Sequence, residues 1–140
     1  MRLAVLDTNV VVSAGIKPDG PPGALIDDWV LERRVQIVTR PRILLEYRVV
    51  VWREKFRRHR FPPEWLEAMI ADSLHLPDPP DWPHPIPDPK DAPFLALAKA
   101  AGAWLVTGNL KHFPRTARNG VTVLSPADYL SRLEESEAGS

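Results

Sequence analysis

Short apolar runs alternate with helical stretches along this chain, and the runs end on polar residues. Four runs are predicted as strands, at 2–7, 35–39, 103–107 and 121–124. Helices are predicted between them at 24–34, 41–56, 64–74 and 91–102, and another begins after Ser125. Strands separated by helices favour an α/β fold with a central parallel sheet and helices on both faces. In such sheets ligands bind beyond the carboxyl ends of the strands, so polar residues at those ends are the candidate site.

Composition sets the outer limits of the interpretation. A chain of 140 residues predicts a single domain, here 1–133, followed by a polar, frayed C-terminal tail at 134–140. The absence of cysteine excludes disulfides, thiol nucleophiles and thiolate zinc sites, and fits a reducing cytoplasm. The first apolar run is too short for a signal peptide or a membrane span, so we expect a cytoplasmic protein without membrane contact. Lys+Arg and Asp+Glu balance at 18 each, so nucleic-acid binding needs a local basic patch.

Proline is the compositional outlier. Eight of the 16 prolines lie between Pro77 and Pro93, which predicts a stiff, extended connection over 77–90. The sequence leaves open whether this segment is a rigid spacer or a strip on which a partner docks.

Two acidic residues stand where a site would need them. Asp7 ends the first strand, and Thr8 and Asn9 follow it closely enough to hydrogen-bond its carboxylate. Taken alone, Asp7 is more simply a helix N-cap. Glu46 interrupts an apolar row of the predicted helix 41–56, and a buried carboxylate needs a metal or a cationic partner. An ion pair with Arg42, four residues earlier, is the structural alternative.

Two further candidates come late in the chain. Asp91 opens the helix 91–102, where capping is again the simpler explanation, and Asp88 before it suits a turn. Asn109 follows Thr107 and Gly108 at the end of the third strand. In a parallel sheet Asp7, Glu46, Asp91 and Asn109 would converge on one pocket. Clustered carboxylates without cysteine or histidine favour Mg²⁺ or Mn²⁺, which can activate water against a phosphodiester.

A basic stretch at 52–60 suits phosphate binding. Arg53, Arg57 and Arg60 would share a face if the helix continues, and they are the candidate substrate contacts. A solvated helix end that complements the helix dipole is an equally good explanation. The four histidines show no metal-ligand spacing, and His112 is expected to be a surface turn residue.

The order of these motifs resembles the PIN-domain nucleases, in particular the VapC-like toxins of toxin–antitoxin pairs. The matching pieces are LAVLDTNVVVSA (3–14), ILLEYRVVVWREKF (43–56), DPKDAPFLALAKAAGAWLVTGN (88–109) and KHFP (111–114). The resemblance implies a three-layer α/β/α fold and a Mg²⁺- or Mn²⁺-dependent endoribonuclease. It implies metal ligands at Asp7, Glu46 and Asp91, and a small hydroxyl residue at Thr8. It also implies a homodimer and an antitoxin protein that blocks the site.

The sequence departs from the family pattern at one position. The fourth acidic position is occupied by Asn109, which can bind a water or give a carbonyl oxygen but adds no charge. This difference motivates a second hypothesis, a catalytically weak PIN-like module that binds RNA or protein. An aspartyl-phosphate enzyme fits less well, because Asn9 stands where such phosphatases need a second acid. We therefore expect a ribonuclease in which Asp7, Glu46, Asp91 and Asn109 are catalytic and Thr8, Asn9 and the arginines of 52–60 contact RNA.

Overall fold

The computed structural model describes residues 2–53 and 63–139. Five parallel strands form one sheet in the order β3-β2-β1-β4-β5. The strands are β1 (Arg2–Leu6), β2 (Val35–Thr39), β3 (Leu74–His75), β4 (Trp104–Val106) and β5 (Val123–Leu124). The central strand β1 pairs Ala4 with Ile37 of β2 and Val5 with Leu105 of β4. These four residues are buried, so both faces of the central strands are covered, as parallel sheets require.

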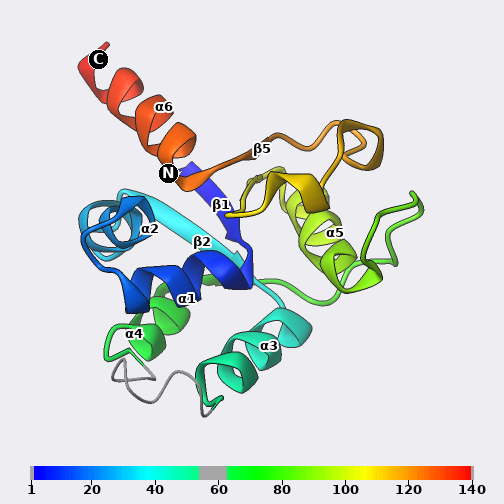
Figure 1. Cartoon of the computed structure of the whole chain (residues 1–140), viewed down its shortest axis with the longest axis horizontal. Coiled ribbons are helices and arrows are strands. Elements are labelled where there is room, and N and C mark those ends of the chain that lie inside the picture. Colours follow the sequence, from blue (N-terminus) through cyan, green and yellow to red (C-terminus); the bar gives the residue numbers. More distant parts are fainter. Residues whose placement is uncertain (1, 54–62, 140) are drawn as a thin grey trace.

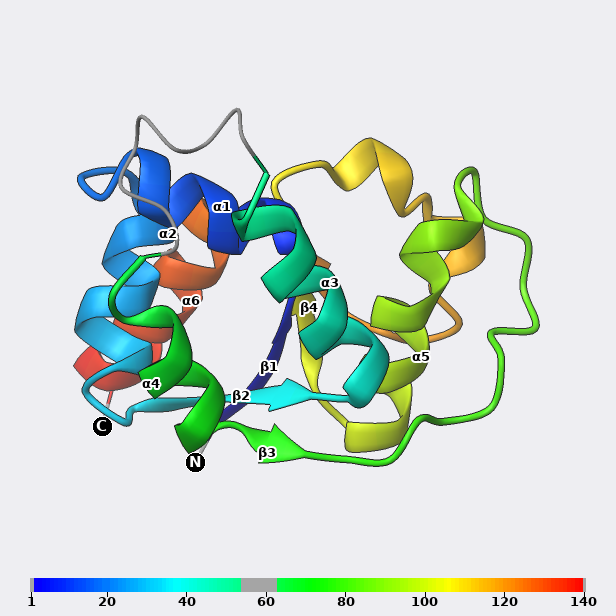
Figure 2. The ribbon, with the colours of Figure 1, turned by 90° about the horizontal axis from the view of Figure 1, so that it is seen from below.

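Helices cover the sheet on two sides (Figures 1 and 2). One side carries α5 (Ala92–Ala101), which packs on β1, β2 and β4. The other side carries α1 (Thr8–Ile16), α2 (Pro21–Ala24) and a π-helical turn (Leu25–Val30), with α6 (Pro126–Ala138) against α2. Helix α3 (Pro41–Val51) contacts both α1 and α5, and α4 (Leu66–Asp72) packs on β2. The three-layer α/β/α fold is thereby confirmed.

The late helices begin and end at the signals that the sequence carries. Helix α5 has Pro93 in its first turn and ends at Gly102, whose φ of 64° is the left-handed conformation that glycine adopts readily. Helix α6 is capped by the Ser125 hydroxyl, which accepts from the backbone N–H of Asp128 at 3.1 Å. The helix continues through residues 134–138, which belong to the expected polar tail.

Three expected boundaries were wrong. Helix α3 ends at Val51, before the predicted 56, so Arg53 lies beyond the helix. Arg57 and Arg60 fall outside the described residues. The predicted helix 64–74 is shorter, and its end is the missed strand β3. The predicted helix 24–34 starts earlier, at Pro21. Pro21 and Pro22 occupy the first turn of α2, where a backbone N–H has no acceptor within the helix, so proline costs no hydrogen bond there.

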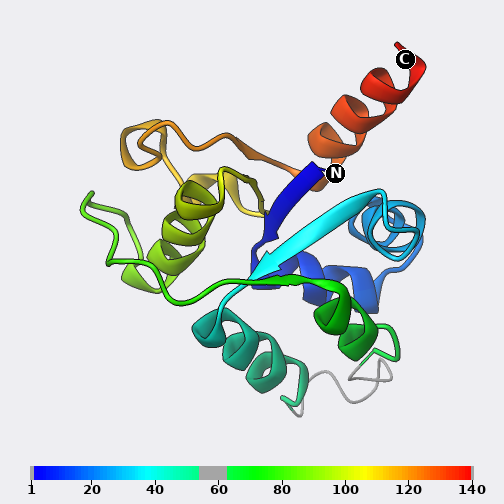
Figure 3. The same ribbon diagram turned by 180° about the vertical axis from the view of Figure 1, so that it is seen from behind.

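The proline-rich segment runs across the sheet edge to α5 as an extended chain (Figures 2 and 3). Two side-chain hydrogen bonds, at Asp78 and at Trp82, hold the first half of this segment to the rest of the fold. Arg40 Nε donates to Asp78 Oδ1 at 2.5 Å, and Trp82 Nε1 donates to the carbonyl of Ala117 at 2.9 Å. Within the described ranges, no helix is long and apolar enough to cross a membrane.

Candidate active site

Asp7 lies where the carboxyl ends of the two central strands meet. Its backbone N–H donates to the carbonyl of Val106, which joins the end of β1 to the end of β4. The side chain is 6 % exposed, and its Oδ2 accepts from Thr107 Oγ1 at 2.8 Å and from Asn9 Nδ2 at 3.2 Å. Asp7 does occupy the N-cap position of α1, but its side chain makes no capping hydrogen bond. The carboxylate is therefore positioned toward the strand ends and not toward the helix.

Asn9 and Thr107 hold this arrangement together. Asn9 Oδ1 accepts from the backbone N–H of Gly108 at 2.9 Å, while its amide nitrogen donates to Asp7. A side chain at position 108 would press on Asn9, since a Cβ there would lie 3.3 Å from Asn9 Oδ1. The hydroxyl of Thr107 is fully buried and also accepts from the N–H of Asn109 at 3.0 Å. Asn9, expected to contact substrate, thus has both ends engaged within the protein and positions Asp7.

Glu46 is brought to Asp7 by two contacts of α3. Thr8 Oγ1 donates a short hydrogen bond to Glu46 Oε2. The next residue, Tyr47, is buried and donates from its hydroxyl to the carbonyl of Leu6 at 2.5 Å, directly before Asp7. The alternative ion pair with Arg42 does not occur, although both side chains lie in the described part of the chain. Glu46 is therefore a half-buried carboxylate that faces Thr8.

Asp91 completes a set of three carboxylates. Asp88 caps the short 3-10 turn Pro89–Asp91 that leads into α5, because its Oδ1 accepts from the N–H of Lys90 at 3.0 Å. Asp91 itself makes no capping hydrogen bond. Asp91 Oδ2 lies 3.0 Å from His112 Nδ1, an ion-pair distance, and this buried oxygen has no other partner among the described residues. His112 was expected at the surface and was missed as a site residue. Its position after Thr107-Gly-Asn, in the KHFP motif, was the available signal.

The pKa values show that the three carboxylates share one electrostatic environment. Burial raises the pKa of Asp7 to about 6; the Thr107 hydrogen bond opposes this, and the charges of Asp91 and Glu46 add to it. Burial also raises the pKa of Asp91, against the lowering effect of His112 and with contributions from Asp88 and Glu46. The pKa of Tyr47 is raised by burial and by the charges of Asp7 and Glu46. Among the described side chains only His112 forms an ion pair with one of these carboxylates, so this part of the site is rich in negative charge.

The other predicted residues lie less centrally. Asn109 follows β4 and is half-buried, and its two described hydrogen bonds involve its backbone: its N–H donates to Thr107 Oγ1 and its carbonyl accepts from the N–H of His112. Arg53 is exposed two residues beyond α3, and the structure gives it no contact with the carboxylates. The carboxylates and Asn109 thus come to the same edge of the sheet, whereas the basic stretch contributes no described contact there.

The donor set fits a hard divalent cation. All candidate ligands are oxygen atoms, one of them the buried Oδ2 of Asp91, and a nearby cation would offset the cost of ionising Asp7. Over 2–53 and 63–139, no three His, Asp or Glu side chains are grouped closely enough to hold an ion on their own. A bound ion would therefore keep water or substrate oxygens among its ligands, as Mg²⁺ commonly does.

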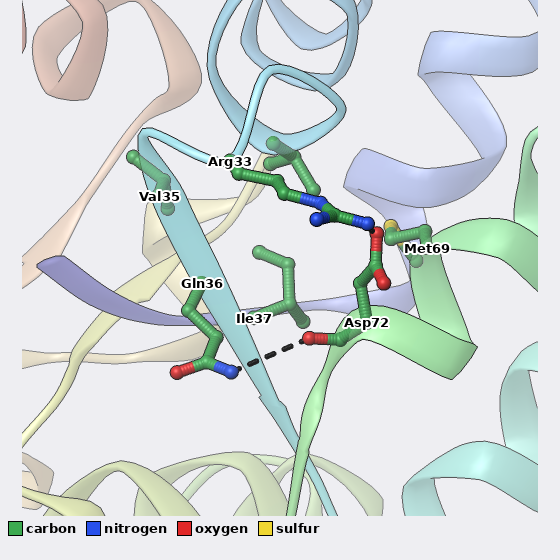
Figure 4. Close-up of a pocket in the computed structure, with 7 residues that line it drawn as sticks. Arg33, Val35, Gln36, Ile37, Met69 and Asp72 are labelled. Carbon is green, nitrogen blue, oxygen red and sulfur yellow. Dashed lines mark hydrogen bonds and ion pairs between the residues drawn. The ribbon is translucent and has the colours of Figure 1, made fainter. Parts of the chain in front are cut away.

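A separate cavity of about 230 Å³ lies between β2 and α4 (Figure 4). Its polar groups already have partners: Arg33 Nε is 3.6 Å from Asp72 Oδ2, and Gln36 Nε2 donates to the carbonyl of Asp72 at 3.3 Å. Val35, at the amino end of β2, is among its lining residues. No predicted site residue lines this cavity, so the carboxylate cluster remains the candidate active site.

Comparison with known proteins now decides the family. The sequence pattern of the PIN domain matches residues 3–111, which include all four residues of the candidate site. The chain belongs to the PIN domain family. This PIN domain finds no match among curated proteins.

Solved structures share the fold of this PIN domain at low sequence identity. VapBC2 from Rickettsia felis, bound to a DNA fragment from its promoter, is similar at a TM-score of 0.60 and 18% identity over 88% of this chain and 98% of that chain. FitAcB from Neisseria gonorrhoeae is similar at 0.57 and 21% identity over 89% and 98%. PAE2754 from Pyrobaculum aerophilum is similar at 0.56 and 18% identity over 96% and 90%.

Proposed function

We propose that this PIN domain is a metal-dependent endoribonuclease and the toxin of a toxin–antitoxin pair. The observation that supports it most is the convergence of Asp7, Glu46 and Asp91 from three separate elements on one charged, half-buried edge of the sheet. Burial, together with the charges of Asp91 and Glu46, raises the pKa of Asp7, so the ionised carboxylate is costly unless a cation binds beside it. Family membership makes phosphodiester hydrolysis the chemistry to test first.

Asp7, Glu46 and Asp91 would hold Mg²⁺ or Mn²⁺, with Asn109 able to bind a metal-bound water. The ion, when bound, would supply Lewis acidity to the phosphodiester and lower the pKa of a bound water. Thr107 and Asn9 fix the Asp7 carboxylate, and Thr8 fixes Glu46, so two of the three ligands are held in place by their neighbours. His112 places its Nδ1 3.0 Å from Asp91 Oδ2 and orients that carboxylate.

An exposed apolar stripe on α3 supports the proposed antitoxin partner. Leu45, Val49 and Trp52 are 64%, 52% and 67% exposed and lie at helical spacing on one face. Arg42 and Arg53 flank this α3 stripe, and among the described residues neither makes an ion pair. Basic flanks would repel in a pair of identical stripes, so the stripe suits an amphipathic segment with acidic flanks. Glu46 lies next to the stripe on α3, so such a segment could also cover the site.

Two solved structures of similar fold support an antitoxin partner by analogy. Their names, VapBC2 and FitAcB, denote complexes of two proteins, and a FitAB complex bound to DNA is also similar in fold. We propose by analogy an antitoxin for this chain, a homodimer formed through another surface, and action on RNA in the cytoplasm. A catalytically weak module that binds RNA or protein is the second candidate, favoured by the neutral Asn109 and by the lack of a preformed group of three ligands among the described side chains.

The test is cleavage of labelled single-stranded RNA with Mn²⁺ or Mg²⁺, against EDTA, by the wild type and by Asp7→Asn. Metal-dependent cleavage that Asp7→Asn abolishes supports the nuclease. Asp27→Asn, an exposed carboxylate away from the site, is the matched control and should cleave normally. Absence of cleavage together with absence of Mn²⁺ binding would favour the binding module.

A further inference from the structure

A second cleft, of about 230 Å³, opens beside the candidate active site. Its walls come from the start of α3, the proline-rich segment and the start of α5, and we call it the proline cleft. The residues used below are Arg42, Pro80, Asp81, Trp82, Pro89 and Pro93. The proline-rich segment, which the family pattern leaves without a role, therefore builds a surface next to the site.

Two residues that line the proline cleft are close along the chain to two of the three carboxylates. Ala92, which also lines it, directly follows Asp91. Arg42 precedes Glu46 by four residues, about one helical turn on the same face of α3. A ligand in the cleft would thus lie within one residue or one turn of the acidic site.

The walls of the cleft are fixed before any ligand arrives. The guanidinium of Arg40 is buried and bound to Asp78, which fastens the start of the proline-rich segment. The indole of Trp82 is held by its hydrogen bond to Ala117. The prolines between these points have fixed φ angles, so little conformational entropy remains to be lost on binding.

The chemistry of the cleft suits a flat ring that carries an anion. Proline rings and the Trp82 indole supply the flat apolar part of a lining that is otherwise polar, and planar rings stack on such surfaces. Arg42 is exposed and makes no hydrogen bond or ion pair with any described residue, so its guanidinium is available for a phosphate. Asp81 is exposed as well and can accept from an N–H of a base or a hydroxyl of a ribose.

We propose that the proline cleft binds one nucleotide of single-stranded RNA beside the phosphodiester that is cleaved. Its phosphate contacts Arg42 and its base stacks in the cleft, with Asp81 at a donor group. The volume is below that of sites for drug-sized ligands, about 300–1,000 Å³, and so limits the occupant to one base. This inference rests on the proposed ribonuclease function and adds to it a residue that governs substrate affinity.

The experiment compares Arg42→Gln with Arg48→Gln, another exposed arginine of α3 that lies outside the cleft. The probe is a short single-stranded RNA that the wild type cleaves, together with versions in which each nucleotide in turn is abasic. Arg42→Gln should raise KM about tenfold and leave kcat within about twofold, because it removes a contact made equally in ground and transition states. Arg48→Gln should change neither value. One abasic position next to the cut should raise KM for the wild type and have less effect on Arg42→Gln.

The same variants separate this proposal from the nuclease itself. Cleavage with equal KM for wild type, Arg42→Gln and Arg48→Gln overturns the cleft and leaves the ribonuclease intact. If no metal-dependent cleavage occurs, the ribonuclease fails, and binding of a randomised single-stranded RNA pool in EDTA decides about the cleft. Weaker binding by Arg42→Gln alone then supports the cleft, and equal binding by all three proteins overturns it.

Discussion

At the scale of single residues, Asp7 carries a cost in stability that the metal-free protein cannot avoid. Its pKa in the folded state is about 6, against 3.8 for an ordinary aspartate. The folded chain therefore holds this proton more tightly than the unfolded chain, so the contribution of Asp7 to stability falls as pH rises from 3.8 to about 6. Above that range its ionisation costs the fold about 3 kcal/mol, since one pKa unit corresponds to about 1.4 kcal/mol.

We therefore expect Asp7→Asn to stabilise the protein in EDTA by up to about 3 kcal/mol at pH 7, and to flatten the pH dependence below pH 6. Asparagine keeps a carbonyl oxygen to accept from Thr107, so the hydrogen bond can survive. Urea unfolding across this pH range measures both effects, with exposed Asp27→Asn as the control. A less stable Asp7→Asn protein at pH 7 would show that the carboxylate is stabilised where it lies.

The sequence predicted the carboxylates of the site better than the residues that hold them. Asp7 ends β1, Asp91 directly precedes α5, and Glu46 interrupts an apolar row within α3, so each is marked by a local signal. Asn9 was expected to hydrogen-bond Asp7, two residues earlier, and its amide does so. Thr107 donates to Asp7 across 100 residues, and nothing local in the sequence indicates this contact. His112 looked like a turn residue because its contact with Asp91 exists only after α5 and the following loop pack.

Asn109 is the residue at which charge can be restored. Asn109→Asp adds a carboxylate at the end of β4, where more oxygen ligands and negative charge favour a divalent cation. We expect tighter Mn²⁺ binding or a second bound ion by calorimetry, and faster RNA cleavage. Asn119→Asp, in an exposed turn, is the control for an added charge. Unchanged stoichiometry, affinity and rate in Asn109→Asp would remove position 109 from the site.

At the scale of elements, periodicity located the helices and missed the short strand. The capping signals of α5 and α6 are local, and both helices begin or end as predicted. Strand β3 has two residues, and pairing with Val38 and Thr39 of β2 defines it, which no local pattern of 74–75 reveals. The end of α3 at Val51 likewise goes against a continuing run of helix-forming residues.

The α3 stripe gives the prediction that belongs to a single element. A synthetic amphipathic peptide with leucines at the same spacing and glutamates on its flanks should bind the wild type and inhibit RNA cleavage, because Glu46 adjoins the stripe. The double variant Leu45→Ser, Val49→Ser should bind it at least about tenfold more weakly in fluorescence anisotropy, since two buried aliphatic contacts are lost. Ile16→Ser, which truncates an exposed residue of α1, should bind it normally. Equal affinity in the double variant would remove the stripe as the docking surface.

At the scale of the whole molecule, the site joins residues that are far apart in the sequence and that the fold brings together. Asp7 follows the central strand, Glu46 lies on α3 against α1 and α5, and Asp91 precedes α5. A cation shared by these carboxylates would link β1, α3 and α5, and it would bind the folded chain far better than the unfolded one. Metal affinity and global stability are then thermodynamically coupled.

This coupling predicts a metal-dependent melting temperature. At Mn²⁺ concentrations about a hundredfold above Kd, the wild type should gain about 2.7 kcal/mol, or roughly 10 °C in Tm for a domain of this size. Asp7→Asn should start from a higher Tm in EDTA and gain little from Mn²⁺, so the two melting curves should approach each other as metal is added. Calorimetric scans of both proteins, with Asp27→Asn following the wild type, measure this convergence. An equal rise in Tm for wild type and Asp7→Asn would place Mn²⁺ elsewhere on the molecule, because a ligand that stabilises through Asp7 cannot act equally without its charge.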